Sequence, residues 1–439
     1  MLIDVQDKSG TYNFSKLDNI LDFLVANGLK PHIELGTKPR RLYRNVQSAI
    51  VEEQVSEPFH GAGEWTGFVR VLMKHLLRRY RRVELNTWRM ELWFSEARLG
   101  DEAAMRRYFE LFNATHTIVK QFADRMEVGG CGMRPDYIDV ENYGRHFLAE
   151  WKKQPCQPDF ISFTYYAYER GEVRDDRYSK RLTDNDGLSH EIKGVREALE
   201  QTGFDTERIY VTEWNLTISD RNAMNDSCFK GAYILKNMID NYGEADLFSY
   251  FTGSDLISEH YDSSGLLNGG TGLLSKDGVM KPAAYAFKFL GWLFPYYLGK
   301  GKHYLLTTDG HDAYGIVCHN QKALNYNYYL SREDDIQKEH LWRYFENQDT
   351  LRLTLRVTGV SGGRYQVKTR QINEQTGDTL GVWREMGYET ELTRNDIAYL
   401  QRASGPKLTI QTIEANGNEL ALPMELLPNE IRFIRIRKL

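Results

Sequence analysis

The first two thirds of the chain alternate short apolar runs with longer stretches of helical periodicity. From Phe14 to Leu24 the apolar residues recur every three or four positions, and Gly28 is placed to end this helix. The run 31–36 then has the character of a strand. A second helix follows, and its predicted apolar face over 68–76 includes Val71. Strands that alternate with helices are typical of a parallel sheet covered by helices. The pattern therefore predicts the α/β class.

Six strand-and-helix units can be counted in this part of the sequence. The strands are centred on Ile33, Leu92, Val128, Ile161, Val211 and Phe248. The remaining helices are expected over 102–122, 142–151, 191–201, 229–242 and 283–290. A closed TIM-type (β/α)8 barrel needs eight such units. We therefore predict a barrel of this type over residues 1–294 that is incomplete, with two units absent.

The last third of the chain changes to a period of two, which is typical of antiparallel strands with one face in water. Apolar and polar residues alternate strictly over Leu351–Val357, and less cleanly over 408–413 and 431–439. We predict that residues 295–439 form an antiparallel β-sandwich, an accessory domain that follows the barrel.

An incomplete parallel sheet leaves backbone donors and acceptors unpaired at both edges, next to an open apolar interior. The exposed apolar area would cost on the order of 10 kcal/mol at about 25 cal/mol per Å². We therefore expect the chain, expressed alone, to aggregate or to form a homo-oligomer through the open side. About 60 further upstream residues, estimated from the usual size of an eight-unit barrel, should restore a monomer.

Composition and charge exclude several classes of protein. Apolar residues make up 41% of the chain and aromatic residues 13%, which excludes disorder. The charges give 56 − 61 = −5, without the surplus of cations that a nucleic-acid partner requires. No run reaches the roughly 18 apolar residues of a membrane span, and the start MLIDVQDKSG lacks the pattern of a signal peptide. We expect a cytoplasmic protein that binds neither nucleic acid nor membranes.

The histidines, cysteines and glycines give no sign of a metal or phosphate site. The four cysteines are far apart and none belongs to a CxxC pair, and the histidines form no HExxH motif. The run 129–132 is rich in glycine but lacks the lysine and the spacing of a phosphate-binding loop, and no GxSxG elbow occurs. We expect no metal, no cofactor and no serine-hydrolase chemistry.

Two carboxylates near the ends of predicted strands are the best candidates for chemistry. Glu213 lies at the tip of the apolar run 211–215, and Glu96 lies just past the tip of the run that begins at Leu92. The C-terminal ends of barrel strands build the active site, and a pair of carboxylates is what glycoside hydrolysis requires. A strand-end carboxylate that caps a helix or pairs with an arginine is an equal reading of Glu213. Glu96 is also a natural first residue for the helix that follows it.

Aromatic residues are expected around the same strand ends, and sugar sites use aromatic faces against pyranose rings. These residues are Trp93, Tyr165, Tyr166, Tyr168, Trp214, Tyr250 and Phe251. Aromatic side chains at strand ends are also ordinary core residues, so alone they are weak support for a sugar site.

At these residues the sequence resembles glycoside hydrolase family 39, the β-xylosidase and α-iduronidase family of retaining barrel enzymes, over nearly the whole chain. The segment 12–36 is similar to the passage through the family's third helix and strand, and 211–215 to its nucleophile strand. The segments 249–255 and 269–273 resemble its last strand and the following loop, and 281–287 its final helix. Each motif is modest evidence, whereas their shared order is strong evidence.

The resemblance implies a two-carboxylate double displacement on β-xylosides or related β-glycosides. Glu213 would be the nucleophile that forms the glycosyl-enzyme ester, Glu96 the acid/base, and Tyr166 a hydrogen-bonding partner beside the nucleophile. The further candidates for substrate contacts are Trp214, Asn215, Phe251, Glu259 and Glu34.

Several positions depart from the family pattern. The family's acid/base strand reads Trp-Asn-Glu-Pro, whereas this chain has Trp93-Phe94-Ser95-Glu96, which places the glutamate one residue late. A shift of one residue turns a strand side chain to the opposite face, so Glu96 serves only if a bulge or an early loop re-aims it. Thr164 stands where the family has a sugar-binding histidine, and Phe251 where it has a substrate-stacking tryptophan.

A binding protein is the second hypothesis. In related bacterial proteins a domain like family 39 follows a helix-turn-helix regulator segment. The altered acid/base motif, together with the apparent absence of two barrel units, is compatible with a fragment of a transcriptional regulator whose domain binds a sugar without hydrolysing it.

Overall fold

The computed structural model describes residues 12–36, 62–93, 102–133, 143–167, 169–170, 178–179, 185–217, 219–255 and 266–439. The chain divides into two compact units. Unit 1 comprises Met1–Tyr165, Glu191–Trp214 and Ala245–Ser249. Unit 2 comprises Tyr166–His190, Asn215–Glu244 and Tyr250–Leu439.

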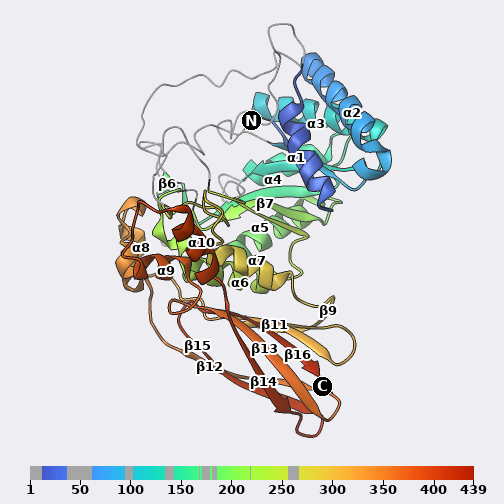
Figure 1. The fold of residues 1–439 in the computed structure, drawn as a ribbon. Helices are drawn as coiled ribbons and strands as arrows, with labels where there is room; N and C mark the ends of the chain where they lie inside the picture. Colours follow the sequence, from blue (N-terminus) through green and yellow to red (C-terminus); the bar gives the residue numbers. More distant parts are fainter. Residues whose placement is uncertain are drawn as a thin grey trace. The chain divides into compact units, whose positions relative to one another are not determined.

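A six-stranded sheet with the order β1-β2-β3-β4-β7-β8 carries the N-terminal part of the fold (Figure 1). Its strands are β1 (His32–Leu35), β2 (Arg89–Trp93), β3 (Glu127–Met133), β4 (Ile161–Tyr166), β7 (Ile209–Asn215) and β8 (Leu247–Tyr250). The pairings from β1 to β4 are parallel. These are the six strands that the sequence predicts, and the α/β class is confirmed.

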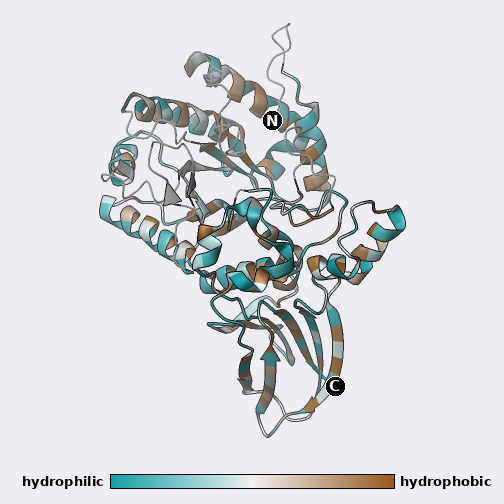
Figure 2. Cartoon of the chain, turned by 90° about the vertical axis from the view of Figure 1, so that its left-hand side faces the viewer, coloured by the Kyte–Doolittle hydropathy of each residue, from teal (hydrophilic) through white to brown (hydrophobic). Residues whose placement is uncertain are grey.

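In the described residues, seven helices alternate with or follow these strands. They are α1 (Ser15–Ala26), α2 (Ala62–Leu85), α3 (Glu102–Phe122), α4 (Tyr143–Lys152), α5 (Gly187–Thr202), α6 (Cys228–Asp240) and α7 (Pro282–Leu290). The helix α6 is buried along nearly its whole length. Figure 2 shows hydrophilic and hydrophobic residues on the same helices, as expected for elements that cover a core on one side.

One residue of the predicted buried face of α2 is misplaced. Val71 is 41% exposed, whereas Val69 and Met73 are fully buried. At 100° per residue the centre of the buried face lies between Leu72 and Leu76, and Val71 points away from that centre.

Side chains on one face of the six-stranded sheet reveal its curvature. Thr212 of β7 donates a hydrogen bond to Glu91 Oε1 of β2 at 3.2 Å, although β3 and β4 lie between these strands. Adjacent strands are about 4.8 Å apart, so a flat sheet would separate the two backbones by about 14 Å, beyond the reach of these side chains. Arg89 and Tyr210 bridge the same two strands at 3.3 Å. The described strands therefore form a half-barrel, which confirms the predicted TIM-barrel type of fold.

Within the described residues, β1 and β8 each have one neighbour in the sheet. The expectation that these edges drive aggregation or oligomer formation, and that upstream residues prevent it, stays a prediction.

The C-terminal part forms the predicted antiparallel β-sandwich. One sheet has the order β14-β13-β16-β11-β10-β9 and the other pairs β12 with β15. The strands are β9 (Tyr296–Gly301), β10 (Tyr304–Thr308), β11 (Ala313–His319), β12 (Leu351–Thr358), β13 (Arg364–Ile372), β14 (Lys407–Glu414), β15 (Glu419–Leu426) and β16 (Ile431–Lys438). Apolar residues of β11, β13 and β16 pack against those of β12 and β15 in one core.

Further short elements belong to unit 2. They are β5 (Glu169–Arg170), β6 (Tyr178–Ser179), the 3₁₀ turns 223–226, 333–335 and 338–344, α8 (Tyr326–Leu330), α9 (Thr379–Glu385) and α10 (Arg394–Ala403). The helices α9 and α10 interrupt the antiparallel strands and pack on Leu266, Leu267 and Val279. The predicted domain boundary at 294/295 falls between α7 and β9, but α6 and α7 group with the antiparallel strands in unit 2, so that boundary stays a prediction.

Candidate active site

Glu213 is the third residue from the C-terminal end of β7, a strand that is buried along its whole length. Its own side chain is 5% exposed. Because strand side chains alternate, Thr212 and Asn215 lie on opposite faces of β7. The contacts that fix the end of this strand can therefore be traced on each face separately.

On the Thr212 face, one buried carboxylate in unit 1 joins four strands. Glu91 of β2 is 0% exposed, and its Oε1 accepts hydrogen bonds from the hydroxyls of Ser162 in β4 and Thr212 in β7. Its Oε2 lies 2.9 Å from Nε2 of His32 in β1. Gly129 of β3 pairs opposite Glu91, and a Cβ at this position would run into Phe160. We call these residues the Glu91 network, and it holds the residue that directly precedes Glu213.

A second polar layer in unit 1 lies two residues earlier along β2 and β7. Glu127 Oε2 accepts hydrogen bonds from Arg89 Nε at 2.9 Å and from the Tyr210 hydroxyl at 2.8 Å. Burial raises the pKa of Tyr210, so this hydroxyl stays a donor. The side chains fill the half-barrel in layers, as in other sheets of this curvature.

On the other face, Asn215 ties the end of β7 to the residue after β8. Its side chain is fully buried, and its Nδ2 donates to the carbonyl oxygen of Phe251. Its Oδ1 accepts from the Leu216 amide at 2.7 Å and from Lys230 Nζ. The rings of Tyr166 and Phe251 meet edge to face with centroids 6.4 Å apart. Three of the predicted site residues, Tyr166, Asn215 and Phe251, are thus brought together from the ends of β4, β7 and β8.

Lys230 of α6 is a fully buried lysine held by amide oxygens. Besides Asn215 it donates to Asn225 Oδ1 at 2.9 Å, and it faces the rings of Tyr233 and Tyr250 at 5.5 and 6.0 Å. No carboxylate among the described residues forms an ion pair with it. Burial, reinforced by the charge of Lys281, lowers the pKa of Lys230 well below its ordinary value.

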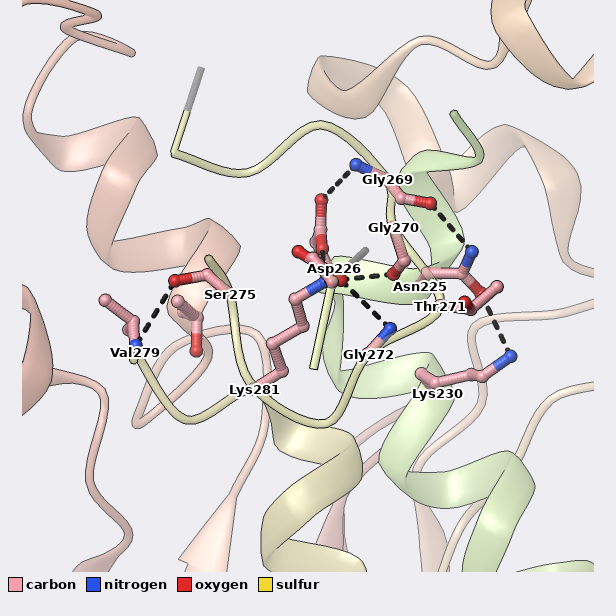
Figure 3. A network of polar contacts seen from close by, with 12 residues as sticks. Asn225, Asp226, Lys230, Gly269, Gly270, Thr271, Gly272, Ser275, Val279 and Lys281 are labelled. Atoms are coloured by element: carbon pink, nitrogen blue, oxygen red, sulfur yellow. Dashed lines mark hydrogen bonds and ion pairs between the residues drawn. The ribbon is translucent and has the colours of Figure 1, made fainter. Parts of the chain in front are cut away.

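A second buried lysine, Lys281, lies next to two carboxylates (Figure 3). Its Nζ lies 2.7 Å from Asp226 Oδ1 and 2.7 Å from Asp255 Oδ1, and it donates to the Gly270 carbonyl at 2.9 Å. The same carboxylates accept the backbone amides of Gly269, at 2.7 Å, and Gly272, at 2.9 Å. We call these residues the Lys281 network.

The loop 269–272 needs glycine because it runs against Asp255. A Cβ at Gly272 would lie 2.1 Å from the Asp255 backbone nitrogen, and one at Gly270 would lie 2.4 Å from Asp255 Oδ1. The loop also receives hydrogen bonds from Asn225 Nδ2, at 2.8 Å to the Gly269 carbonyl, and from the Tyr250 hydroxyl, at 3.1 Å to the Thr271 carbonyl. The glycine-rich motif that carries part of the family resemblance therefore has a structural reason in this chain.

The environment of the Lys281 network shifts the pKa values of Lys281 and Asp255. Burial opposes the charged form of Lys281, but Asp226 and Asp255 outweigh it, and the pKa of Lys281 is raised. Burial also raises the pKa of Asp255 to about 6, with help from the Asp226 charge and against the attraction of Lys281. Two carboxylates around one cation leave an excess of negative charge in a buried place.

The other predicted site residues are only partly placed. Glu34 is an exposed residue of β1, and Trp214 is fully buried with its ring 6.5 Å from that of Phe248. Glu96 and Glu259 lie outside the described residues. Sequence reasoning missed Glu91, Lys230 and Lys281, although the charged Glu91 inside the apolar run 90–94 was a usable signal.

The described residues contain no group of three or more histidine, cysteine, aspartate or glutamate side chains placed to hold a metal ion. None of their helices is long and apolar enough to cross a membrane.

Comparison with known proteins gives one consistent result. The model of the family described as glycosyl hydrolases family 39 matches residues 2–419. A β-xylosidase of Geobacillus stearothermophilus is 26% identical over 438 residues, which cover 97% of this chain and 81% of that protein. The crystal structure of a monomeric β-xylosidase from Caulobacter crescentus CB15 matches with a TM-score of 0.78 and 25% identity, over 100% of this chain and 87% of that one.

Proteins of the second hypothesis match over a shorter stretch. An uncharacterized HTH-type transcriptional regulator of Staphylococcus aureus is 21% identical over 235 residues, which are 52% of this chain and 29% of that protein.

Proposed function

The chain belongs to glycosyl hydrolases family 39, and on this premise we propose that it hydrolyses β-xylosides with retention of configuration, with Glu213 as the nucleophile. The proposal is carried by the match of the family model to residues 2–419, in a fold that has Glu213 near the C-terminal end of β7. The β-xylosidases named above support the choice of substrate.

The proposed reaction is a double displacement. The Glu213 carboxylate attacks the anomeric carbon, the glycosidic C–O bond breaks, and the leaving oxygen takes a proton from the acid/base. This gives a glycosyl ester on Glu213. Water, deprotonated by the same acid/base, then attacks the anomeric carbon, and the ester C–O bond breaks to free the sugar and the carboxylate. No cofactor enters either step.

For the acid/base we propose Glu96. Retaining enzymes place the two carboxyl groups roughly 5–5.5 Å apart, and the donor needs a pKa near neutrality. Tyr166 and Phe251 are the proposed sugar-contacting residues, because they meet at the ends of β4 and β8. Glu34, Trp214 and Glu259 remain proposed contacts on the strength of the sequence.

The nucleophile is tested by trapping. A 2-deoxy-2-fluoro-β-xyloside with a good leaving group should inactivate the protein and add one sugar to the peptide that contains Glu213, read by mass spectrometry. The variant E213Q should lose at least about 10³-fold in kcat. E207Q is the matched control, because Glu207 is an exposed carboxylate just before β7 and should leave kcat unchanged. Labelling of another residue would refute the assignment of Glu213.

The acid/base is tested by the leaving group. E96A should slow a xylobioside far more than a 4-nitrophenyl xyloside, because only the poor leaving group needs a proton. Azide should restore turnover of the activated substrate. Equal losses on both substrates would remove Glu96 from the mechanism.

A further inference from the structure

We propose that Lys230 is a positioning residue for the reaction: it fixes the Asn215 carboxamide, which in turn fixes the end of the strand that presents Glu213. The inference rests on the proposed function. It adds a group on α6 that reaches the reacting carboxylate only through the backbone of β7.

Lys230 contributes to the orientation of the Asn215 carboxamide. A carboxamide can be turned by half a rotation with little change in shape, and its hydrogen-bond partners decide which way it points. Lys230 Nζ donates to Oδ1 and so holds this oxygen toward α6, while Nδ2 donates to the Phe251 carbonyl. Without the lysine, the Leu216 amide and the Phe251 carbonyl would still select this orientation, but Oδ1 would lose its contact with α6.

Asn215 is linked to Glu213 through the backbone of β7, because it follows Glu213 by two residues in that strand. The hydrogen bond from Asn215 to Phe251 also crosses from the end of β7 to the end of β8. A displacement of about 1 Å at a reacting group can lower a rate about 100-fold. A contact that fixes this strand end can therefore have a large effect on the rate of the reaction.

The two buried lysines of α6 have different partners. Lys236 is also buried, at 5% exposure, but its Nζ is paired with Asp186 at 2.6 Å and Asp240 at 2.7 Å. Such pairing stabilises a fold once both charges are in place. Lys230 has no such pair among the described residues, and a buried amine without a counter-charge is poor for stability. A buried lysine of this kind is better explained by a geometric task than by a contribution to folding.

The experiment compares two substitutions of one kind in one helix. K230M should lower kcat on 4-nitrophenyl β-xyloside about 10- to 100-fold and change KM less than about threefold, because binding survives while attack is misaligned. Its melting temperature should stay within about 3 °C of that of the parent protein. K236M should show the reverse, with a melting temperature lower by several degrees and an unchanged kcat. Inactivation by the fluoro-sugar should slow in K230M by the same factor as kcat.

A second variant and a second measurement distinguish a positioning role from a general loss of folding. N215D keeps an acceptor for Lys230 and supplies a counter-charge, so it should fold well, but it has no hydrogen for the Phe251 carbonyl and should lose kcat like K230M. Hydrogen exchange of the Asn215 side-chain amide, followed by NMR, should be slow in the parent protein and fast in K230M, and this readout needs no activity.

The outcomes separate the inference from the proposed function. A K230M protein with kcat within twofold of the parent, or with a protected Asn215 amide, would overturn the positioning role. Equal loss of kcat in K236M would overturn it too, because any change in α6 would then suffice. A parent protein that shows the exchange pattern but neither cleaves nor is labelled by any β-xyloside would refute the proposed function instead.

Discussion

The Glu91 network of unit 1 and the Lys281 network of unit 2 handle buried charge in opposite ways. Glu91 is a single carboxylate that receives two hydroxyl hydrogen bonds and one histidine contact, all from strands of one sheet. Lys281 is a cation between two carboxylates that also hold backbone amides of a loop. Contacts of the first network reach Thr212. Asn225 links the loop of the second network to Lys230, which donates to Asn215. The residues on both sides of Glu213 along β7 are therefore anchored to buried polar groups.

The difference shows what each kind of network depends on. Hydroxyl donors around one carboxylate lose a single interaction when one of them is removed. Opposite charges in a buried place depend on their balance, because removing the cation leaves two carboxylates that repel each other away from water. The second network should therefore be the more fragile, and the predictions below test this order.

The largest effect is expected for K281M. Removing the ammonium group leaves Asp226 and Asp255 buried with no positive charge between them. We expect a loss of about 3–5 kcal/mol in the free energy of unfolding at pH 7. Urea unfolding measures it. The loss should shrink toward pH 5, because protonation of Asp255 relieves the repulsion. K276M is the control, because Lys276 is an exposed lysine and should change stability by less than about 0.5 kcal/mol. A loss in K281M no greater than that in K276M would contradict the comparison.

A smaller effect is expected for E91Q. The amide keeps an oxygen for Ser162 and Thr212 but has no charge, so each remaining hydrogen bond weakens, and we expect a loss of about 1–3 kcal/mol. Thermal and urea unfolding measure it. E110Q, at an exposed position of α3, should change nothing measurable. If E91Q were as destabilising as K281M, the distinction between the two networks would be wrong.

The smallest effect is expected for D255N, and it concerns pH. The folded-state pKa of Asp255 is raised to about 6, so between about pH 4 and 6 the folded chain holds a proton that the unfolded chain releases. The contribution of Asp255 to stability therefore falls as pH rises through this window. D255N removes that contribution and leaves Lys281 balanced by Asp226 alone, so it should be more stable than the parent at pH 7 by on the order of 1 kcal/mol.

Thermal melts from pH 4 to 7.5 measure this difference. The difference between D255N and the parent should grow with pH up to about 6 and then level off. A difference that is independent of pH would show that burial does not perturb Asp255 in this way.

The elements of the fold could be predicted from local patterns in the sequence. The six strands of the half-barrel and most of its helices follow from the spacing of apolar residues, and the strands 351–358 and 431–438 follow from period-two alternation. The pairs α9–α10 and β5–β6 were not predicted, because short elements inside polar stretches carry little periodic signal. The strand-end position of Glu213 could also be predicted, since an acidic residue at the end of an apolar run is a local feature of the sequence.

What the sequence by itself determined is which residues are apolar, where they recur and hence where each strand ends. Only the tertiary structure decided the partners of Glu91, Lys230 and Lys281. Thr212 lies 121 positions from Glu91 along the chain, and Lys281 lies 26 from Asp255, so nothing local in the sequence links them. Hydrogen bonds and ion pairs act over a few ångströms, and the curvature of the sheet and the path of the loop 269–272 set which polar groups come that close.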